Sequence, residues 1–228
     1  DFVGTGTKIV QVQRVFDQFR YNEVVFNQTV NSYAQTTANK LSRLDETMSD
    51  VGPNITNSLN DLFSAVNSLV DVPGDLGLRE VMLSKADTLA QNVQSMQRSL
   101  DAEYNAVNDD LESTAAIVSE IAEQLAVINR DVVTASVNQG SPNDLLDKRD
   151  QLIKELSQYT TVSTVPTTDG AMNVYIANGQ TLVTGITHFS LKTVDGNPDP
   201  RQKEIVIEAP SGAQQQLVGK SMGGNIGA

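Results

Sequence analysis

Few residues in this sequence have the types and spacing that catalysis requires. The one histidine, His188, precedes Phe189 between two expected strands, and the chain has no cysteine that could complete a zinc site with it. A Ser-His-Asp arrangement would need a nucleophile-elbow sequence, which the chain lacks. We therefore expect His188 to be an ordinary packed or surface residue.

The acidic residues offer a second possibility. Asp144, Asp147 and Asp150 follow one another at spacings of three and share part of a helix surface, where they could in principle bind a divalent metal. Acids near a helix start, on a solvated face, explain the same pattern more simply. The neighbours Asp109 and Asp110 point in different directions on a helix and make a poor acid/base pair.

The glycines near the end of the chain do not form a phosphate loop. Gly223, Gly224 and Gly227 are not followed by the Lys-Ser/Thr pair that such a loop needs. The sequence therefore contains no credible active site. We expect no enzyme activity, no metal and no cofactor.

Composition limits the possible partners. The 228 residues include 16 Lys and Arg against 28 Asp and Glu, a net charge of −12. That balance argues against nucleic acid and against anionic lipid. Disulfides are excluded because there is no cysteine, and no apolar run approaches the ~20 residues of a membrane span. The chain begins with Asp rather than Met and stops before its last element is complete, so we expect a fragment trimmed at both ends.

The dominant element is a helical run over residues 76–137. Its apolar side chains recur at gaps of three or four, and neither Pro nor Gly interrupts it after Leu78. About 60 residues at a rise of about 1.5 Å give a rod of roughly 90 Å. We therefore expect an elongated protein built for scaffolding. The apolar positions that form this stripe are Ala86, Leu89, Val93, Met96, Leu100, Tyr104, Val107, Leu111, Ala115, Val118, Ile121, Leu125, Ile128 and Val132.

Three further helices are predicted around this run. The first covers residues 14–48, and Gly52-Pro53 separates it from a second over residues 54–72. Asn138-Gln139-Gly140 ends the long run, and Ser141 caps a last helix that continues to Tyr159. We predict an antiparallel bundle in which the first and third helices lie along each other, with the short second helix covering one end.

From Thr160 the apolar period changes to two, which predicts an antiparallel β-meander with hairpins. The turns are expected at Asp169-Gly170 and at Asn178-Gly179, where both residues tolerate a positive φ. The last strands have no visible partner. The expected strands cover residues 161–165, 172–176, 181–184, 189–194 and 204–209.

The predicted fold class is α+β, mainly α. Residues 1–159 would form an elongated antiparallel bundle of long helices. Residues 160–228 would form a small antiparallel β region, which is either a small lobe on the bundle or the start of a further domain that continues beyond the fragment.

One motif carries a family resemblance. The run from Asn143 to Leu152, followed by Glu155-Leu156-Ser157, resembles the signature of the bacterial flagellar hook-associated protein 1 family, the hook–filament junction proteins. Its signature positions, which we expect to be structural, are Asn143, Asp144, Leu145, Leu146, Asp147, Arg149, Asp150 and Leu152.

Other stretches resemble the same family. Gly4-Thr5-Gly6 resembles the entry to its first long helix, and Leu78-Arg79-Glu80 the start of its central helix. Residues 173–180 resemble its first β-hairpin, and residues 223–227 the approach to a further helix. The resemblance covers nearly the whole chain.

The resemblance implies a structural component of the bacterial flagellum and of motility. Family members are secreted unfolded through the flagellar type III export route. They self-associate in a ring at the distal end of the hook, outside the cell, between the hook protein and the second junction protein. Their terminal segments form an inner coiled-coil tube, and an export chaperone binds the C-terminal end; both features would be missing from this fragment.

Several alternatives remain open. Flagellin and the second junction protein share the layout of long helices and hairpins, although the motif at residues 143–152 disfavours them. A helical surface adhesin or sensor would be a binding module, and no charged cluster indicates its ligand pocket. A glycan hydrolase carried on the flagellum would need two carboxylates about 5 to 9 Å apart across a cleft. No sequence feature supports that pair.

Overall fold

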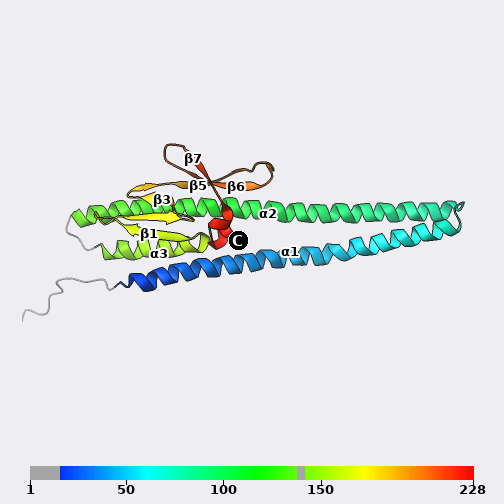
Figure 1. Cartoon of the computed structure of the whole chain (residues 1–228), viewed down its shortest axis with the longest axis horizontal. Helices are drawn as coiled ribbons and strands as arrows, with labels where there is room; N and C mark the ends of the chain where they lie inside the picture. The colour runs from blue at the N-terminus through cyan, green and yellow to red at the C-terminus, as the bar shows by residue number, and fades with distance from the viewer. Residues whose placement is uncertain (1–15, 138–141) are drawn as a thin grey trace, which may run out of the picture. The chain divides into compact units, whose positions relative to one another are not determined.

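The computed structural model describes residues 16–137 and 142–228. Expectations for residues 1–15, for the helix stop at 138–140 and for the Ser141 cap lie outside this part of the chain. Three helices, α1 (Gln18–Asp71), α2 (Leu76–Val137) and α3 (Asn143–Tyr159), precede the strands (Figure 1). The strands are β1 (Val162–Pro166), β2 (Met172–Ile176), β3 (Gln180–Thr184), β4 (Thr187–His188), β5 (Ser190–Asp195), β6 (Lys203–Glu208) and β7 (Gln214–Leu217). The short helices η1 (Gly219–Ser221) and α4 (Gly224–Gly227) follow.

Residues Thr37–Asp110 form one packing unit, which is an antiparallel hairpin of two helices. The turn between them contains Pro73 and Gly74, as the sequence predicts. Asp75 caps the returning helix, because its Oδ1 accepts hydrogen bonds from the backbone N–H of Gly77 (2.7 Å) and Leu78 (3.1 Å). The Arg79 guanidinium donates back to the carbonyl of Pro73, which closes the turn.

Three contacts fix the register of this hairpin. Lys85 pairs with Asp61 at 2.8 Å, Asn92 donates to the carbonyl of Asn54 at 3.2 Å, and Arg43 pairs with Glu103 at 3.6 Å. The steps between contacts are seven and then eleven residues on both helices. At 3.6 residues per turn, eighteen residues correspond to five turns, so the first and last contacts fall on the same face of each helix.

The expected helix break at Gly52-Pro53 is wrong. Helix α1 runs unbroken from Gln18 to Asp71 with Pro53 inside it. Proline removes one backbone N–H and costs about 3 kcal/mol in a helix interior. Here the pairing with α2 continues on both sides of Pro53, so the tertiary contacts outweigh that local cost. The predicted second helix is therefore the second half of the first.

The other unit contains Leu111–Ala228 together with the described residues up to Thr36. Its strands form two antiparallel sheets, one in the order β1-β2-β3-β4 and one in the order β5-β6-β7. Five expected strands are confirmed within a residue or two, whereas β4 and β7 were not predicted. The expectation that the last strands lack a partner is wrong, because β6 pairs with both β5 and β7.

The second hairpin turn differs from the prediction in length. Ile176 pairs with Gln180, which leaves three connecting residues rather than two. Ala177 has a φ of 49° and Gly179 a φ of 91°, so the left-handed positions flank Asn178 rather than include it. The glycine is placed where a positive φ is needed, while Ala177 bears a strain that the flanking strands hold in place.

The buried core of this unit lies between the carboxyl-terminal half of α2, α3 and the two sheets (Figure 1). Leu125, Leu156, Ile176 and Leu182 are almost completely buried there. Ser119 of α2 also covers the edge of β5, since its hydroxyl accepts from the Leu191 N–H and donates to the Leu191 carbonyl. The outward backbone groups of this one residue of the edge strand are therefore satisfied by a side chain.

The packing units differ from the expected division at residue 160. One core contains side chains of α1, α2 and α3 as well as those of the strands. A small sheet with one apolar face needs a partner layer, and the nearest helices supply it. As a domain boundary, residue 160 stays a prediction. The structure's own division lies instead at Thr36 and Leu111.

Asn129 of α2 fixes the first sheet to the helices. Its side chain is 1% exposed and donates to the carbonyls of Met172 (2.8 Å) and Gly185 (2.7 Å). It also accepts a hydrogen bond from the Met172 N–H at 3.0 Å. Three backbone groups of two strand segments therefore depend on one side chain.

We predict that Asn129→Ala lowers the free energy of unfolding by about 3 kcal/mol or more, because buried unpaired groups cost about 1–3 kcal/mol each. Urea denaturation followed by circular dichroism measures this. Asn105→Ala, at an exposed position of the same helix, is the matched control and should change stability by less than about 0.5 kcal/mol. Equal effects of the two substitutions would contradict the role of Asn129.

Candidate functional site

The signature residues lie on α3, in the unit that contains the strands. Asp144 and Asp147 are exposed, and Asp144 lies in the first helical turn, where a carboxylate is favourable. Asn143, Leu145 and Leu146 are half-buried, and both leucines pack against the core. The helix begins after Pro142, which makes no side-chain cap. These positions therefore divide between solvent and core.

The other signature residues connect α3 to its neighbours. Arg149 is 6% exposed and donates from Nη1 to the carbonyl of Gly170 at 2.9 Å. Tyr21 of α1 donates its hydroxyl to the backbone carbonyl of Asp150 at 2.7 Å, and Leu152 is part of the core. One face of α3 thus touches the turn of the first hairpin and another touches α1.

The turn that Arg149 contacts is itself closed by hydrogen bonds. The Thr167 hydroxyl donates to the Asp169 carboxylate, which also accepts from the Ala171 N–H at 3.2 Å. These bonds lower the pKa of the exposed Asp169 carboxyl below its ordinary value, with the Thr167 bond as the largest cause. Asp169-Gly170 is thus a turn, as the sequence predicts, and Gly170 has a φ of 93°.

Another set of contacts connects the end of α3 to the last residues of the chain. The carbonyl of Met222 accepts from the Thr161 N–H at 2.6 Å and from the Thr160 hydroxyl at 2.8 Å. Thr29 of α1 donates to the carbonyl of Ser157 at 2.8 Å. Thr160 and Met222 have no exposed surface. We call these residues, with Gly223 and Gly224, the C-terminal joint.

Glycine is required in this joint for steric reasons. A Cβ on Gly224 would lie 2.5 Å from the carbonyl carbon of Tyr159 and 2.6 Å from the backbone nitrogen of Thr160. A Cβ on Gly223 would lie 2.4 Å from the Thr161 hydroxyl. Both glycines also have a positive φ. The pair was predicted not to be a phosphate loop, and it serves here to let two backbones approach closely.

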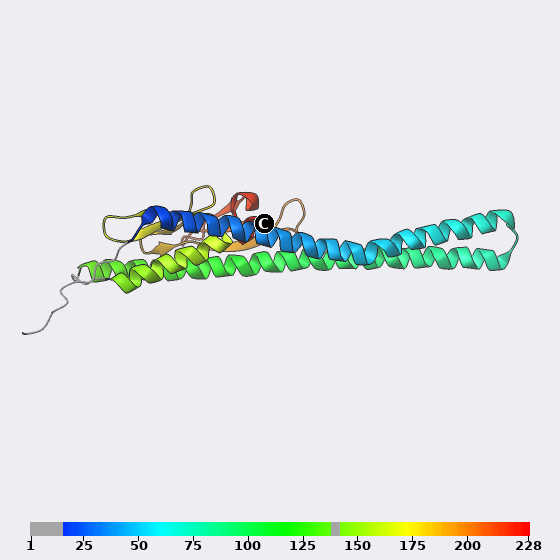
Figure 2. The same ribbon diagram turned by 90° about the horizontal axis from the view of Figure 1, so that it is seen from below.

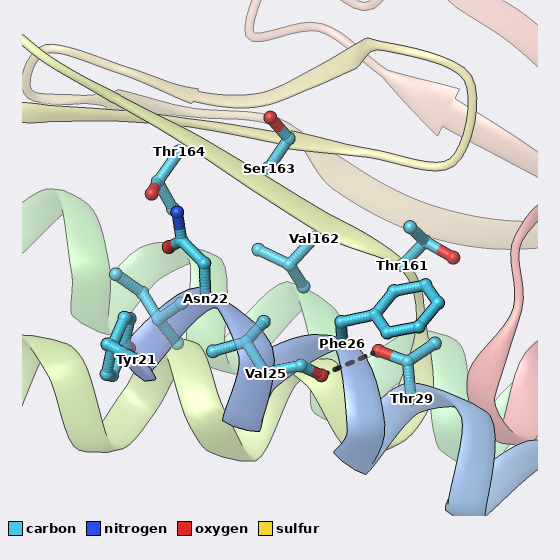
Figure 3. Close-up of a pocket in the computed structure, with 10 residues that line it drawn as sticks. Tyr21, Asn22, Val25, Phe26, Thr29, Thr161, Val162, Ser163 and Thr164 are labelled. Carbon is cyan, nitrogen blue, oxygen red and sulfur yellow. Dashed lines mark hydrogen bonds between the residues drawn. The ribbon is translucent and has the colours of Figure 1, made fainter. Parts of the chain in front are cut away.

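A groove of about 200 Å³ lies beside the joint, between α1, α3 and β1. Figure 3 shows Val25 and Phe26 of α1 facing Val162 of β1 and the preceding Thr161, with the Asn22 amide directed at Thr164. The lining contains hydroxyls, amides and apolar side chains but no charged group. It can pack against another surface, but it has no acid, base or nucleophile pair for catalysis.

Neither of the other candidate groups forms a reactive site. His188 lines a separate hollow of about 370 Å³ with Glu208, Ser190 and Thr187, at the ends of the two sheets. In residues 16–137 and 142–228, no three His, Cys, Asp or Glu side chains are placed to hold a metal ion. Within the same residues, no helix has the length and apolar character needed to cross a membrane.

Sequence reasoning missed several members of the site. Tyr21, Thr29 and Asn129 act through side chain to backbone bonds across 43 to 129 residues, and no local pattern marks such bonds. The adjacent glycines Gly223 and Gly224 were a visible signal, because two neighbouring glycines often mark a close backbone approach. The site as a whole is a set of packing joints between helices and strands, the arrangement of a structural protein.

Comparisons with known proteins give the particular family. The family model for the flagellar hook-associated protein FlgK helical domain matches residues 41–228. Flagellar hook-associated protein 1 of Salmonella typhimurium is 30% identical over 206 residues, which are 90% of this chain and 37% of that protein. Its Bacillus subtilis counterpart is 25% identical over 156 residues, 68% of this chain and 31% of that protein.

A solved structure agrees. The flagellar hook junction protein FlgK from Burkholderia pseudomallei superposes with a TM-score of 0.83 and 27% identity, over 90% of this chain and 38% of that one. The chain belongs to the FlgK family of flagellar hook-associated proteins. It spans little more than a third of the length of the Salmonella typhimurium and Burkholderia pseudomallei relatives.

Substitution of Gly224 tests the C-terminal joint. Gly224→Ala should cost at least about 3 kcal/mol of unfolding free energy, from left-handed strain plus backbone overlap. Gly212→Ala is the matched control, since Gly212 also has a positive φ (84°) but no atom within 4 Å of the position that a Cβ would take. It should cost only about 1–2 kcal/mol. Chemical denaturation measures both, and equal costs would remove the steric argument.

The Asp169 turn predicts a dependence on pH. Its carboxyl has a lowered pKa in the folded state, so the ionised form stabilises the turn above the unfolded pKa of about 3.9. That stability is lost as the pH falls through the folded pKa. Thr167→Ala should raise the pKa of Asp169, because it removes the largest cause of the shift. Carboxyl titration by NMR measures this, and an unchanged pKa would contradict the assignment.

Proposed function

We propose that this chain is part of a protein that joins the hook of the bacterial flagellum to its filament. The observation that carries the proposal is the family match over residues 41–228. The Salmonella relative is named a flagellar hook-associated protein and the Burkholderia structure a flagellar hook junction protein. The role is structural rather than catalytic, since the described contacts serve packing and the groove has no charged lining.

The proposal includes self-association in a ring at the end of the hook. Helix α1 offers a surface that suits contact with a second copy. Phe19 is 79% exposed and Phe26 63% exposed, and large apolar side chains in solvent often mark contact surfaces. No charged residue occurs from Val24 to Asn39. In a chain of net charge −12, such a stretch lets two copies approach without repulsion between carboxylates.

The remaining partners follow from the same role. The hook protein would lie on one side of the ring and the second junction protein on the other. Export through the flagellar type III route, with a chaperone that binds the C-terminal end of the full-length protein, would bring the protein outside the cell. The absence of cysteine suits passage in an unfolded state, since no disulfide can form before export.

Deletion of the gene that encodes this chain is the direct test. We expect electron microscopy to show hooks without filaments and the culture medium to contain flagellin monomers. A plasmid copy of the gene should restore filaments, which controls for effects on neighbouring genes. Normal filaments on the deletion strain would overturn the proposed function.

A second test addresses the α1 surface. Phe19→Ser and Phe26→Ser should weaken contact between copies, reduce swimming in soft agar and leave the free energy of unfolding unchanged within about 0.5 kcal/mol, because both side chains are already exposed. Asn27→Ser, at an exposed polar position of the same helix, is the control and should leave swimming unchanged. Normal swimming in both phenylalanine variants would remove this surface from the proposal.

A further inference from the structure

Helix α1 contains a discontinuity that α2 lacks. Gly52 and Pro53 lie inside α1, while α2 has no Pro or Gly after Gly77. Proline cannot donate to the carbonyl of residue 49, so one bond of the ladder is missing. Figure 2 shows α1 changing direction where its colour passes from light blue to cyan. Bends of this kind in helices usually arise at proline.

Side-chain hydrogen bonds to backbone carbonyls cluster around this point. Asn54 donates to the carbonyl of Asp50 and Thr56 to that of Gly52. Ser58 donates to the carbonyls of Asn54 (2.8 Å) and Ile55 (3.0 Å). Bonds of this kind from Ser and Thr to the carbonyl four residues earlier are associated with bending of helices. Four carbonyls within six residues are served in this way.

The packing near Pro53 resists bending only weakly. The nearest fully buried side chain on α1 is the small Ser58 (5% exposed). The apolar side chains closest to Pro53, those of Val51 and Ile55, are only half-buried, and Met48 and Leu59 are about 40% exposed. The Asn92 amide of α2 donates to the Asn54 carbonyl, so the contact between the helices at this level is partly polar. Few buried apolar contacts mean that local distortion costs little free energy.

We propose that Gly52-Pro53 is a flexure point of the hairpin, with α2 as the continuous strut. Two paired helices can bend in their common plane only if their path lengths change relative to each other. At an interaxial distance of about 9 Å, a bend of about 10° needs a difference of about 1.5 Å, the rise of one residue. The missing bond at Pro53 lets α1 change its length there. The contacts Lys85–Asp61 and Arg43–Glu103 hold the register on either side.

Distance measurements between spin labels test the proposal directly. Since the chain has no cysteine, cysteines can be introduced in exposed pairs that span 22 residues on each helix. The first pair, Asp45→Cys and Asn67→Cys, brackets Pro53 on α1. The second, Asp87→Cys and Asp109→Cys, is the matched control on α2. We expect the distribution of spin-label distances on α1 to be at least about twice as wide as the corresponding distribution on α2.

The decisive variant is Pro53→Ala, which restores the missing donor. It should narrow the α1 distribution to the width found for α2 and slow amide exchange over residues 52–58. Gly52→Ala has no atom within 4 Å of its new Cβ and should narrow the distribution only in part. Equal widths on the two helices of the unsubstituted chain, or a Pro53→Ala width that does not change, would overturn the proposal.

The side-chain hydrogen bonds near Pro53 can be tested with a separate matched control. Thr56→Ala should speed amide exchange around Pro53, because it removes a donor that the bent helix needs. Thr88 makes the same bond to the carbonyl four residues earlier, but on uninterrupted α2. Thr88→Ala should therefore leave exchange around it unchanged. The reverse result would contradict a special role for the polar side chains near Pro53.

A consequence for motility rests on the proposed junction role. If the hairpin flexes within an assembled junction, Pro53→Ala should form normal filaments that break off more often in viscous medium. The label measurements do not depend on that role, so the flexure point and the proposed function can fail separately.

Discussion

The strand-containing unit depends on the C-terminal joint, where the Met222 carbonyl meets the end of α3. That carbonyl receives two donors from Thr160 and Thr161, and the flanking Gly224 lies against the backbone of Tyr159 and Thr160. Thr29 connects α1 to the same helix end through Ser157. Helix ends leave carbonyls without partners. The Ser157 carbonyl near the end of α3 accepts a hydrogen bond from Thr29, more than a hundred residues away. The bond that satisfies this helix end therefore also joins α3 to α1.

The two units illustrate different ways to stabilise long helices. In the strand-containing unit, α2 buries side chains such as Leu125 and Val132 under two sheets, and Asn129 ties the backbone of one sheet to the helix. In the unit of residues 37–110, two helices have only each other, and side chains such as Leu41 and Phe63 remain in solvent. A two-helix hairpin cannot enclose a core. Its two helices bury side chains such as Leu62 and Leu89 only in part, and the spaced polar contacts between them contribute little stability individually.

The groove and the C-terminal joint contain no charged side chain, which fits a structural role. Arg149 is the only charged side chain that is fully buried among the described residues, and it bonds to the Gly170 carbonyl in the hairpin turn. The carboxyls with lowered pKa are those of Asp169, Asp199 and Glu208, which are exposed or half-buried and lie in turns or in a cross-strand pair of the sheets. Catalytic sites instead place perturbed groups together in a cleft. In this chain the polar groups hold backbones together.

Local patterns in the sequence determined the long helix after Leu78, the helix that ends at Tyr159 and five of the seven strands, because apolar periods of 3.6 and two are local properties. They also gave the family through the residues from Asn143 to Leu152. Tertiary structure decided the rest. It carried α1 through Pro53, since pairing with α2 outweighs one missing bond, and it placed Asn129 and Thr29 against backbones distant in sequence. It also supplied β7 as a partner, although its three glutamines show no apolar alternation. Such features depend on which distant groups meet, and no short window of sequence records that.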